Sequence, residues 1–275
     1  MIDVSKLEHV APDYDLRDLL EAGCHFGHDA SHWHPKMDEW IYSKQDGIHI
    51  FDLEKTAAQL AIAYNYFYYL GKEGKVIVFV GTKRQARETL KEKAQAAKVN
   101  FITSRWLGGL LTNWQQVSRS LRKMIEIETG LAEDKYKMYT KFEQTQLEKE
   151  AGRYARFFDG LRDLKKVPDA IFVIDPKKEN IAIKEAQVID IPVVGLVDTN
   201  TDPQSIDVVI PANDDGRTSI EFIIDQLIEA YTKGKANKNG EKAQPKKEVS
   251  KKTETKEAAP KKVKKVKKAK KTKKG

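Results

Sequence analysis

The chain has 275 residues, of which 40% are hydrophobic and 33% charged, so it can build a substantial core in one large domain or two small ones. Its single cysteine, Cys24, excludes an intrachain disulfide framework and is typical of a reducing compartment. The sequence has no long apolar run, and its acidic N-terminus lacks an apolar core. It therefore predicts neither a membrane span nor a signal peptide, but a cytoplasmic protein.

The net charge of +8 is unevenly distributed. Residues 233–275 hold 19 Lys against 4 Glu, whereas residues 1–232 have a net charge of −7. We expect a folded domain over 1–232 and a disordered tail over 233–275, because such a tail cannot bury enough apolar surface to offset the entropy of ordering. Basic tails often bind nucleic acid, with solubilisation as the alternative. The candidate tail residues are Lys261, Lys262, Lys264 and Lys265.

Short apolar runs alternate with helical patterns along the folded part. Buried strands are expected at 75–80, 170–174, 192–197 and 208–210, and helices at about 54–70, 82–97, 177–189 and 215–231. Asp52, Thr82 and the Asp214–Asp215 pair are the expected helix N-caps. Strands that alternate with helices predict a doubly wound parallel α/β sheet.

The segment 112–166 interrupts this alternation, because it shows no strand pattern. Two charged stretches in it carry narrow apolar stripes, formed by Trp114, Val117, Leu121 and Met124, and by Leu147, Ala151, Tyr154, Phe158 and Leu161. Such stripes suit two helices packed on each other. Thr112 with Gln115 predicts a capping box at the start, and 130–135 a turn. We expect an inserted antiparallel helical hairpin, with two ordinary layer helices as the alternative.

The most distinctive motif is RWLGGLLTNW at 105–114, which follows a strand-like run at 99–103 and is called the RWLGGLLTNW loop below. Its paired glycines let the backbone turn or approach another surface closely. Trp offers flat faces for stacking, and Arg offers a fork of donors for phosphate. The motif predicts a loop that faces nucleic acid. The candidate RNA-binding residues here are Arg105, Trp106, Asn113 and Trp114, with Arg119, Arg122 and Lys123 on the following helix and Lys36 nearer the N-terminus.

GTKR at 81–84 follows a buried strand and opens a helix. Amides at a helix N-terminus attract anions, and Lys83 and Arg84 add positive charge. We expect a contact with RNA phosphate, with ordinary helix-start chemistry as the alternative. A nucleotide enzyme would need a glycine-rich cradle at this point, and neither GxxxxGK[ST] nor GxGxxG occurs.

Three further clusters have structural explanations. Cys24, His25 and His28, with His32 and His34, could ligate zinc, but their spacing matches no common zinc finger. Packing and hydrogen bonding are therefore favoured over a metal as the role of these residues.

Asp198 and Asp202 in DTNTDP could hold Mg²⁺, but a turn built on side-chain hydrogen bonds is favoured. The aromatic cluster at 64–69 could stack on bases, but is expected in the core.

The RWLGGLLTNW loop closely resembles the signature of the small-subunit ribosomal protein two family. Other segments resemble that family's motifs in the same order, so the resemblance covers about 16–231. They are LLEAGCHFGH (19–28), WHPKM (33–37), IHIFDLEKT (48–56), VIVFVGTKRQA (76–86), PDAIFVID (168–175), IAIKEA (181–186), IPVVGLVDTNTDP (191–203) and VIPANDD (209–215).

The resemblance implies a flavodoxin-like α/β domain with a protruding coiled-coil hairpin. It also implies a structural constituent of the small ribosomal subunit that binds small-subunit ribosomal RNA and neighbouring proteins, including the mRNA-binding protein one. No catalysis and no cofactor are implied. Two other classes remain as alternatives: an α/β nucleotide- or phosphate-binding enzyme, and a histone-like nucleic-acid-binding protein driven by its tail. The missing glycine loop argues against the first, and the acidic body argues against the second.

Overall fold

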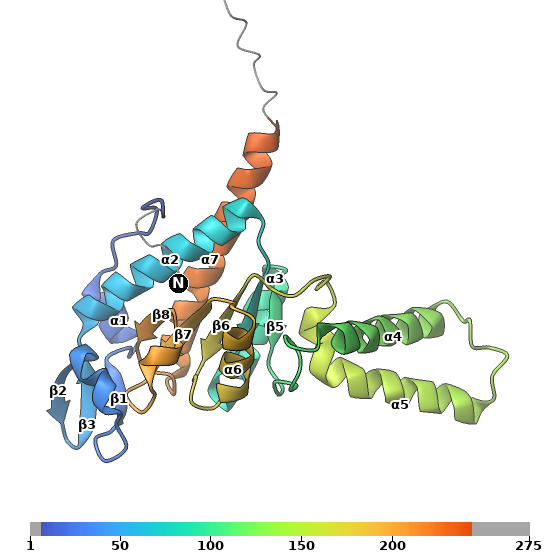
Figure 1. Cartoon of the computed structure of the whole chain (residues 1–275), viewed down its shortest axis with the longest axis horizontal. Helices are drawn as coiled ribbons and strands as arrows, with labels where there is room; N and C mark the ends of the chain where they lie inside the picture. Colours follow the sequence, from blue (N-terminus) through green and yellow to red (C-terminus); the bar gives the residue numbers. More distant parts are fainter. Residues whose placement is uncertain (1–6, 244–275) are drawn as a thin grey trace, which may run out of the picture. The chain divides into compact units, whose positions relative to one another are not determined.

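The computed structural model describes the backbone of residues 7–243 and the side chains of residues 7–238. A sheet of five parallel strands forms the centre of the fold (Figure 1). Apolar runs predict four of them, and the fifth, β5, lies in the run at 99–103. The strands are β4 (Ile77–Val80), β5 (Asn100–Ile102), β6 (Ala170–Ile174), β7 (Val193–Val197) and β8 (Val208–Pro211). They read as continuous apolar runs because helices cover both faces of the sheet.

The strand order is β5-β4-β6-β7-β8, one of the two common orders of doubly wound sheets. The chain enters at β4, adds β5 on one side, and then adds β6, β7 and β8 on the other. The order reverses between β4 and β6, where ligands of such sheets usually bind. Because all five strands are parallel, the loops after β4, β6, β7 and β8 meet at the same edge.

One face of this sheet packs against α1 (Leu16–Glu21), α2 (Leu53–Glu73), α3 (Arg84–Ala96) and α7 (Arg217–Ala243). Its centre is aromatic: the Phe79 ring lies 5.6 Å from that of Phe67 and 5.5 Å from that of Phe172. Tyr64, Tyr66 and Tyr68 are also buried, as expected, whereas Tyr69 is exposed.

The other face packs against α6 (Asn180–Val188), the RWLGGLLTNW loop and the bases of the two hairpin helices. Val78, Val80 and Val173 of the sheet lie in this second core. Side chains of one strand therefore alternate between the two cores.

Helix α7 continues to Ala243, past residue 232 where the sequence predicts the folded domain to end. The physical reason is its packing along α2. A Cβ at Gly234 would lie 2.2 Å from the Tyr68 carbonyl oxygen, so only glycine permits this approach of the two helices. The Asn237 side chain then donates to the Tyr68 hydroxyl, and Lys233 lies over the Tyr64 ring. Lys261, Lys262, Lys264 and Lys265 lie outside the described residues.

A second, antiparallel sheet near the N-terminus was not predicted from the sequence. It contains β1 (Phe26–Asp29), β2 (Ile41–Gln45) and β3 (Ile48–Phe51) in the order β1-β3-β2, and a short 3₁₀ helix, Pro35–Trp40, connects its first two strands. The β2–β3 turn is the Asp46–Gly47 pair, with φ of 49° and 85°. This dipeptide is a standard signal for a tight hairpin. The strands are short, bulged and half exposed, so they carry no clear apolar alternation.

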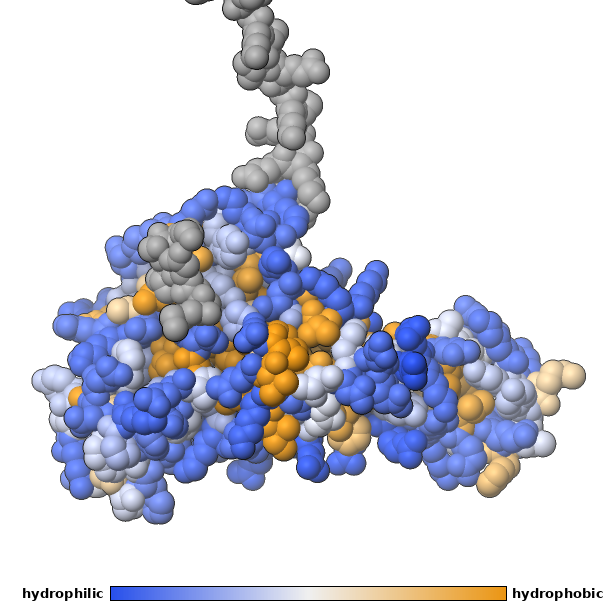
Figure 2. All heavy atoms as spheres, viewed as in Figure 1, coloured by the Kyte–Doolittle hydropathy of each residue, from blue (hydrophilic) through white to orange (hydrophobic). Residues whose placement is uncertain are grey.

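Two long helices between β5 and β6 form the expected hairpin. α4 (Trp114–Ala132) and α5 (Lys141–Phe158) pack against each other and extend away from the sheet (Figure 1). Figure 2 shows a largely hydrophilic surface along this pair, with apolar atoms at its far end. That end exposes Met138, Tyr139 and Phe142.

The helix starts show where the capping predictions were right and wrong. Asp52 caps α2 by accepting from the Glu54 amide. Thr112 forms no capping box, because its amide and hydroxyl are hydrogen-bonded to another helix and Asn113 precedes α4. The capping box belongs instead to α5, between Thr140 and Glu143. Gly130 is helical, and the turn begins only after Ala132.

Two further capping predictions were wrong for the same reason, a partner far away in sequence. The Thr82 hydroxyl donates to Glu179 instead of capping α3. At the start of α7 the Asn213 side chain accepts from the amides of Asp215 and Gly216, while Asp214 is buried and bound to Lys83. No helix within residues 7–243 is long and apolar enough to cross a membrane.

Candidate nucleic-acid interface

Glu185 of α6 fixes the RWLGGLLTNW loop. Its side chain is buried and accepts five hydrogen bonds from the loop. Oε1 accepts from the Trp106 indole at 3.1 Å and the Gly109 amide at 2.7 Å. Oε2 accepts from the Leu111 amide at 3.0 Å, and from the amide and hydroxyl of Thr112 at 3.4 Å each. A buried carboxylate surrounded by donors in this way ties both ends of the loop to one helix.

The two glycines of the loop have different roles. Gly109 has a φ of 86°, a conformation that side chains other than glycine rarely adopt, and it lets the backbone turn so that its amide faces Glu185. A Cβ at Gly108 would meet no atom within 4 Å. The backbone conformation at position 109 therefore requires glycine. At Gly108, by contrast, the space beside the backbone is empty, so a side chain would fit there.

The loop presents polar groups and hides one of its tryptophans. Arg105 and Asn113 are exposed, and Trp114 is half buried against the second core. Trp106 is only 4% exposed, with its indole hydrogen-bonded to Glu185. The predicted stacking face of Trp106 is therefore covered, and this residue holds the loop in place.

The two cations of the GTKR segment, Lys83 and Arg84, have different surroundings. Lys83 lies within 2.6 Å of both Asp214 Oδ1 and Asp215 Oδ1, and 3.7 Å from Asp175 Oδ2. Burial alone would lower the pKa of Lys83, but these carboxylates outweigh it and raise the pKa. Lys83 is therefore neutralised within the fold. Arg84, the first residue of α3, is exposed, and no carboxylate within residues 7–238 pairs with it.

The hairpin carries the remaining predicted cations on α4. Arg119 and Arg122 are exposed, and Arg122 Nε donates to the Ser118 carbonyl oxygen one turn earlier. Lys123 Nζ lies 2.6 Å from Glu150 Oε1 of α5, so this lysine crosslinks the two helices. The hydrogen bond to Glu150 raises the pKa of Lys123.

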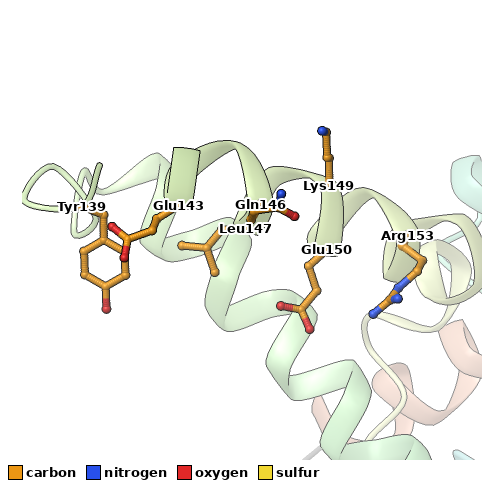
Figure 3. Close-up of a pocket in the computed structure, with 7 residues that line it drawn as sticks. All are labelled: Tyr139, Glu143, Gln146, Leu147, Lys149, Glu150 and Arg153. Carbon is orange, nitrogen blue, oxygen red and sulfur yellow. The ribbon is translucent and has the colours of Figure 1, made fainter. Parts of the chain in front are cut away.

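A shallow groove of about 530 Å³ follows α5 on the hairpin and has mixed charge. Figure 3 shows Leu147 and Glu150 directed toward α4, and Lys149 directed away from it. Arg153 lies at the inner end, with its guanidinium 5.5 Å from the Tyr154 ring centre.

These features are an ordered, glycine-containing loop beside two exposed hairpin arginines, on a doubly wound sheet without a phosphate-binding glycine loop. A family model described as Ribosomal protein S2 matches residues 19–234. The chain belongs to the ribosomal protein S2 family. The resemblance predicted from the motifs is thereby confirmed.

Ribosomal protein S2 is a structural protein of the small ribosomal subunit, and its family is not one of enzymes. The nucleotide-enzyme and histone-like alternatives are therefore set aside. The matched range spans the sheet, the RWLGGLLTNW loop and the whole hairpin.

The remaining predicted residues, Lys36, Cys24, His25 and His28, belong to the N-terminal part of the sequence. Lys36 Nζ lies 2.9 Å from Asp202 Oδ2 and also donates to Gln204. Asp202 accepts from the Gln204 amide at the start of a short 3₁₀ helix, Pro203–Ser205, which confirms the expected turn. Lys36 is partly exposed, and its charge is shared with Asp202.

Cys24 and His25 do not join a metal-ligand cluster among the described residues. Cys24 is fully buried, accepts a hydrogen bond from the Ser219 hydroxyl, and has a pKa raised by burial to about 11. It is therefore a core thiol at neutral pH. His28, by contrast, lies beside two buried aspartates, Asp198 and Asp214.

The sequence interpretation missed Glu185 as the residue that organises the loop. It occurs in IAIKEA, more than seventy positions after the donors it binds. The only local signal is a glutamate on the apolar side of a helix, between the buried residues Ile183 and Ala186. Such a position indicates a buried carboxylate that needs partners, but not which partners.

Proposed function

We propose that this ribosomal protein S2 family member binds small-subunit ribosomal RNA through exposed cations around the RWLGGLLTNW loop. The proposed contacts are Arg84, Arg105, Asn113 and Trp114, with Arg119 and Arg122 on α4. Lys36 and Lys123 can contribute when RNA phosphate competes with their carboxylate partners. The flavodoxin-like fold and a coiled-coil packing of α4 on α5 belong to the same proposal, as does binding to neighbouring ribosomal proteins, including the mRNA-binding protein one.

One observation supports this proposal most strongly. Glu185 makes the loop rigid, and Arg105 and Asn113 remain exposed at its two ends. No carboxylate within residues 7–238 pairs with Arg105, Arg119 or Arg122. Cations that are exposed, unpaired and carried on fixed elements can neutralise phosphates and release their counterions without first breaking a salt bridge. RNA would be recognised here through its shape and its unpaired segments.

The charge of the domain argues for such local contacts. Residues 1–232 have a net charge of −7, so the body as a whole repels a polyanion. Binding must therefore depend on a few cations placed where the RNA lies. This makes the proposal sensitive to small sets of substitutions.

The test replaces Arg84 and Arg105 together by alanine and measures the amount of the protein in purified small subunits. Two phosphate contacts are lost, so we expect reduced incorporation and a salt dependence of RNA binding shallower by about two phosphates. The matched control is Arg17→Ala with Arg217→Ala, two exposed arginines on α1 and α7, outside the RWLGGLLTNW loop, the GTKR segment and the hairpin. Unchanged stoichiometry in the Arg84/Arg105 variant, or an equal loss in the control, would contradict the proposed interface.

A further inference from the structure

A cluster of acidic residues that RNA binding does not explain lies at the carboxyl edge of the sheet. Asp175 follows β6, Asp198 follows β7, and Asp214 and Asp215 follow β8. His28 of β1 and Lys83 after β4 complete it. Lys83 offsets only one of the four carboxylate charges, so the cluster has an excess of negative charge at the point where doubly wound sheets bind ligands.

Three of these residues converge. One nitrogen of His28 and one oxygen from each of Asp198 and Asp214 all lie within 4.8 Å of one another. His28 Nδ1 is 2.8 Å from Asp198 Oδ2. Ligands around a tetrahedral zinc ion are separated by about 3.3–3.6 Å, as bond lengths of 2.0–2.2 Å require. The three groups can therefore reach one ion through side-chain movements of about an ångström.

Most of the donors around these two carboxylates are on one oxygen of each, although Asp198 Oδ2 also accepts from the Asp214 amide at 3.5 Å and lies 2.8 Å from His28 Nδ1. Asp198 Oδ1 accepts from the amides of His28 and Thr199 and from the Thr199 hydroxyl. Asp214 Oδ1 accepts from Lys83 at 2.6 Å. Within the described residues, Asp214 Oδ2 has no hydrogen-bond partner, although Asp214 is completely buried. A buried, unpartnered carboxylate oxygen beside a second carboxylate is costly unless it takes up a proton or a cation binds it.

The surroundings of His28 are those of a metal ligand. Its Nε2 lies 3.2 Å from Asp215 Oδ2, on the side of the ring opposite to Nδ1. Without an ion, His28 Nδ1–H donates to Asp198 Oδ2 at 2.8 Å, and a metal ion would take the place of that proton while Nε2–H stays directed at Asp215. A carboxylate that accepts from the far nitrogen is the usual outer partner of a metal-bound histidine.

We propose that His28, Asp198 and Asp214 bind one divalent transition-metal ion, for which zinc is the best match, with Asp215 as the outer partner of the histidine. A nitrogen ligand favours zinc over Mg²⁺ or Ca²⁺, which select oxygen donors. The ion links β1 of the small sheet to the loops after β7 and β8, and its fourth position is left to water. The site differs from the cysteine-containing cluster suggested by sequence spacing, with which it shares only His28.

The experiment uses the full-length chain, stripped with EDTA, re-equilibrated with ZnCl₂ and desalted. Elemental analysis of the wild type should give about one equivalent of zinc, and competition with a chromophoric chelator gives the affinity. Asp214→Asn keeps the shape and the acceptor oxygen for Lys83 but removes the ligand charge, so its zinc affinity should fall by about 100-fold or more. Asp215→Asn should lose about 10- to 100-fold.

His32→Ala is the matched control, since His32 is exposed in the same segment and does not belong to the cluster. It should retain zinc at the wild-type stoichiometry and affinity. Zinc should also raise the thermal midpoint of the wild type but not of Asp214→Asn. The wild type retaining less than about a tenth of an equivalent, or Asp214→Asn binding zinc as tightly as the wild type, would overturn the proposal even if RNA binding is as proposed.

Discussion

At the scale of single residues, buried carboxylates decide which parts of this protein are fixed and which cations remain free. Glu185 satisfies both of its oxygens with donors from the RWLGGLLTNW loop, so the loop is held without using a cation. Asp214 takes up the charge of Lys83. Arg105 is left unpaired among the described residues, so under the proposed function it can bind RNA phosphate without first breaking a salt bridge.

Replacing Glu185 by glutamine tests the role of this anchor. The amide retains one acceptor, so the NH₂ group faces backbone N–H donors and some of the five hydrogen bonds are lost. We expect a loss of about 1–3 kcal/mol in the free energy of unfolding, measured by urea denaturation, and faster hydrogen exchange at Gly109. Glu88→Gln, an exposed substitution on α3, should change stability by less than about 0.5 kcal/mol. Equal midpoints for Glu185→Gln and the wild type would disprove the anchor.

The sequence indicated which residues are candidates for the interface, but it did not indicate which groups inside the protein contact them. Residue type and spacing identified Arg105 and Asn113 in the RWLGGLLTNW loop and Arg84 at a helix start, and all three are exposed. The same reasoning placed Lys83 and Trp106 in the interface, although both are held inside the fold. Burial depends on carboxylates from distant segments, which no local pattern reveals.

At the scale of elements, two glycines allow helices α2 and α7 to pack closely against each other. A Cβ at Gly71 would lie 2.3 Å from the Tyr231 carbonyl oxygen, and one at Gly234 would lie 2.2 Å from that of Tyr68. The neighbouring atoms belong to backbone and cannot move independently. The close approach explains why α7 continues beyond the predicted boundary, since each added turn packs along α2.

Gly234→Ala should therefore force the two helices apart and destabilise the protein by about 1–3 kcal/mol, despite the higher helix propensity of alanine. Gly152→Ala in α5 is the matched control, because a Cβ there meets no atom within 4 Å. It should stabilise the protein by about 0.5–1 kcal/mol. Thermal unfolding of both variants gives the comparison, and a Gly234→Ala variant as stable as Gly152→Ala would argue against the tight crossing.

Elements with a strong apolar pattern were predictable, and the others were not. β4, β6, β7 and β8 are buried runs whose signal is local. The small sheet was missed because its three strands are short and bulged, although Asp46–Gly47 marks its hairpin. Helix starts at Thr82 and Thr112 were wrong, because their hydroxyls are bound to Glu179 and Glu185 instead of their own helices.

At the scale of the whole molecule, charge is divided between a mildly acidic body and a strongly basic C-terminal segment. Residues 1–232 carry −7, and residues 233–275 carry 19 Lys against 4 Glu. Attraction through lysines alone would be non-specific and would weaken steeply with salt. The proposed binding through the RWLGGLLTNW loop and the hairpin would depend on fixed shape as well as charge, so it should persist at salt concentrations that release proteins bound by charge alone.

Sedimentation of the native protein through sucrose gradients in high salt tests the central claim most directly. A structural component of the small subunit that is held by ordered loop and hairpin contacts should migrate with the small-subunit peak at about one copy per particle. Recovery of the protein at the top of the gradient, with intact small subunits that lack it, would contradict the account.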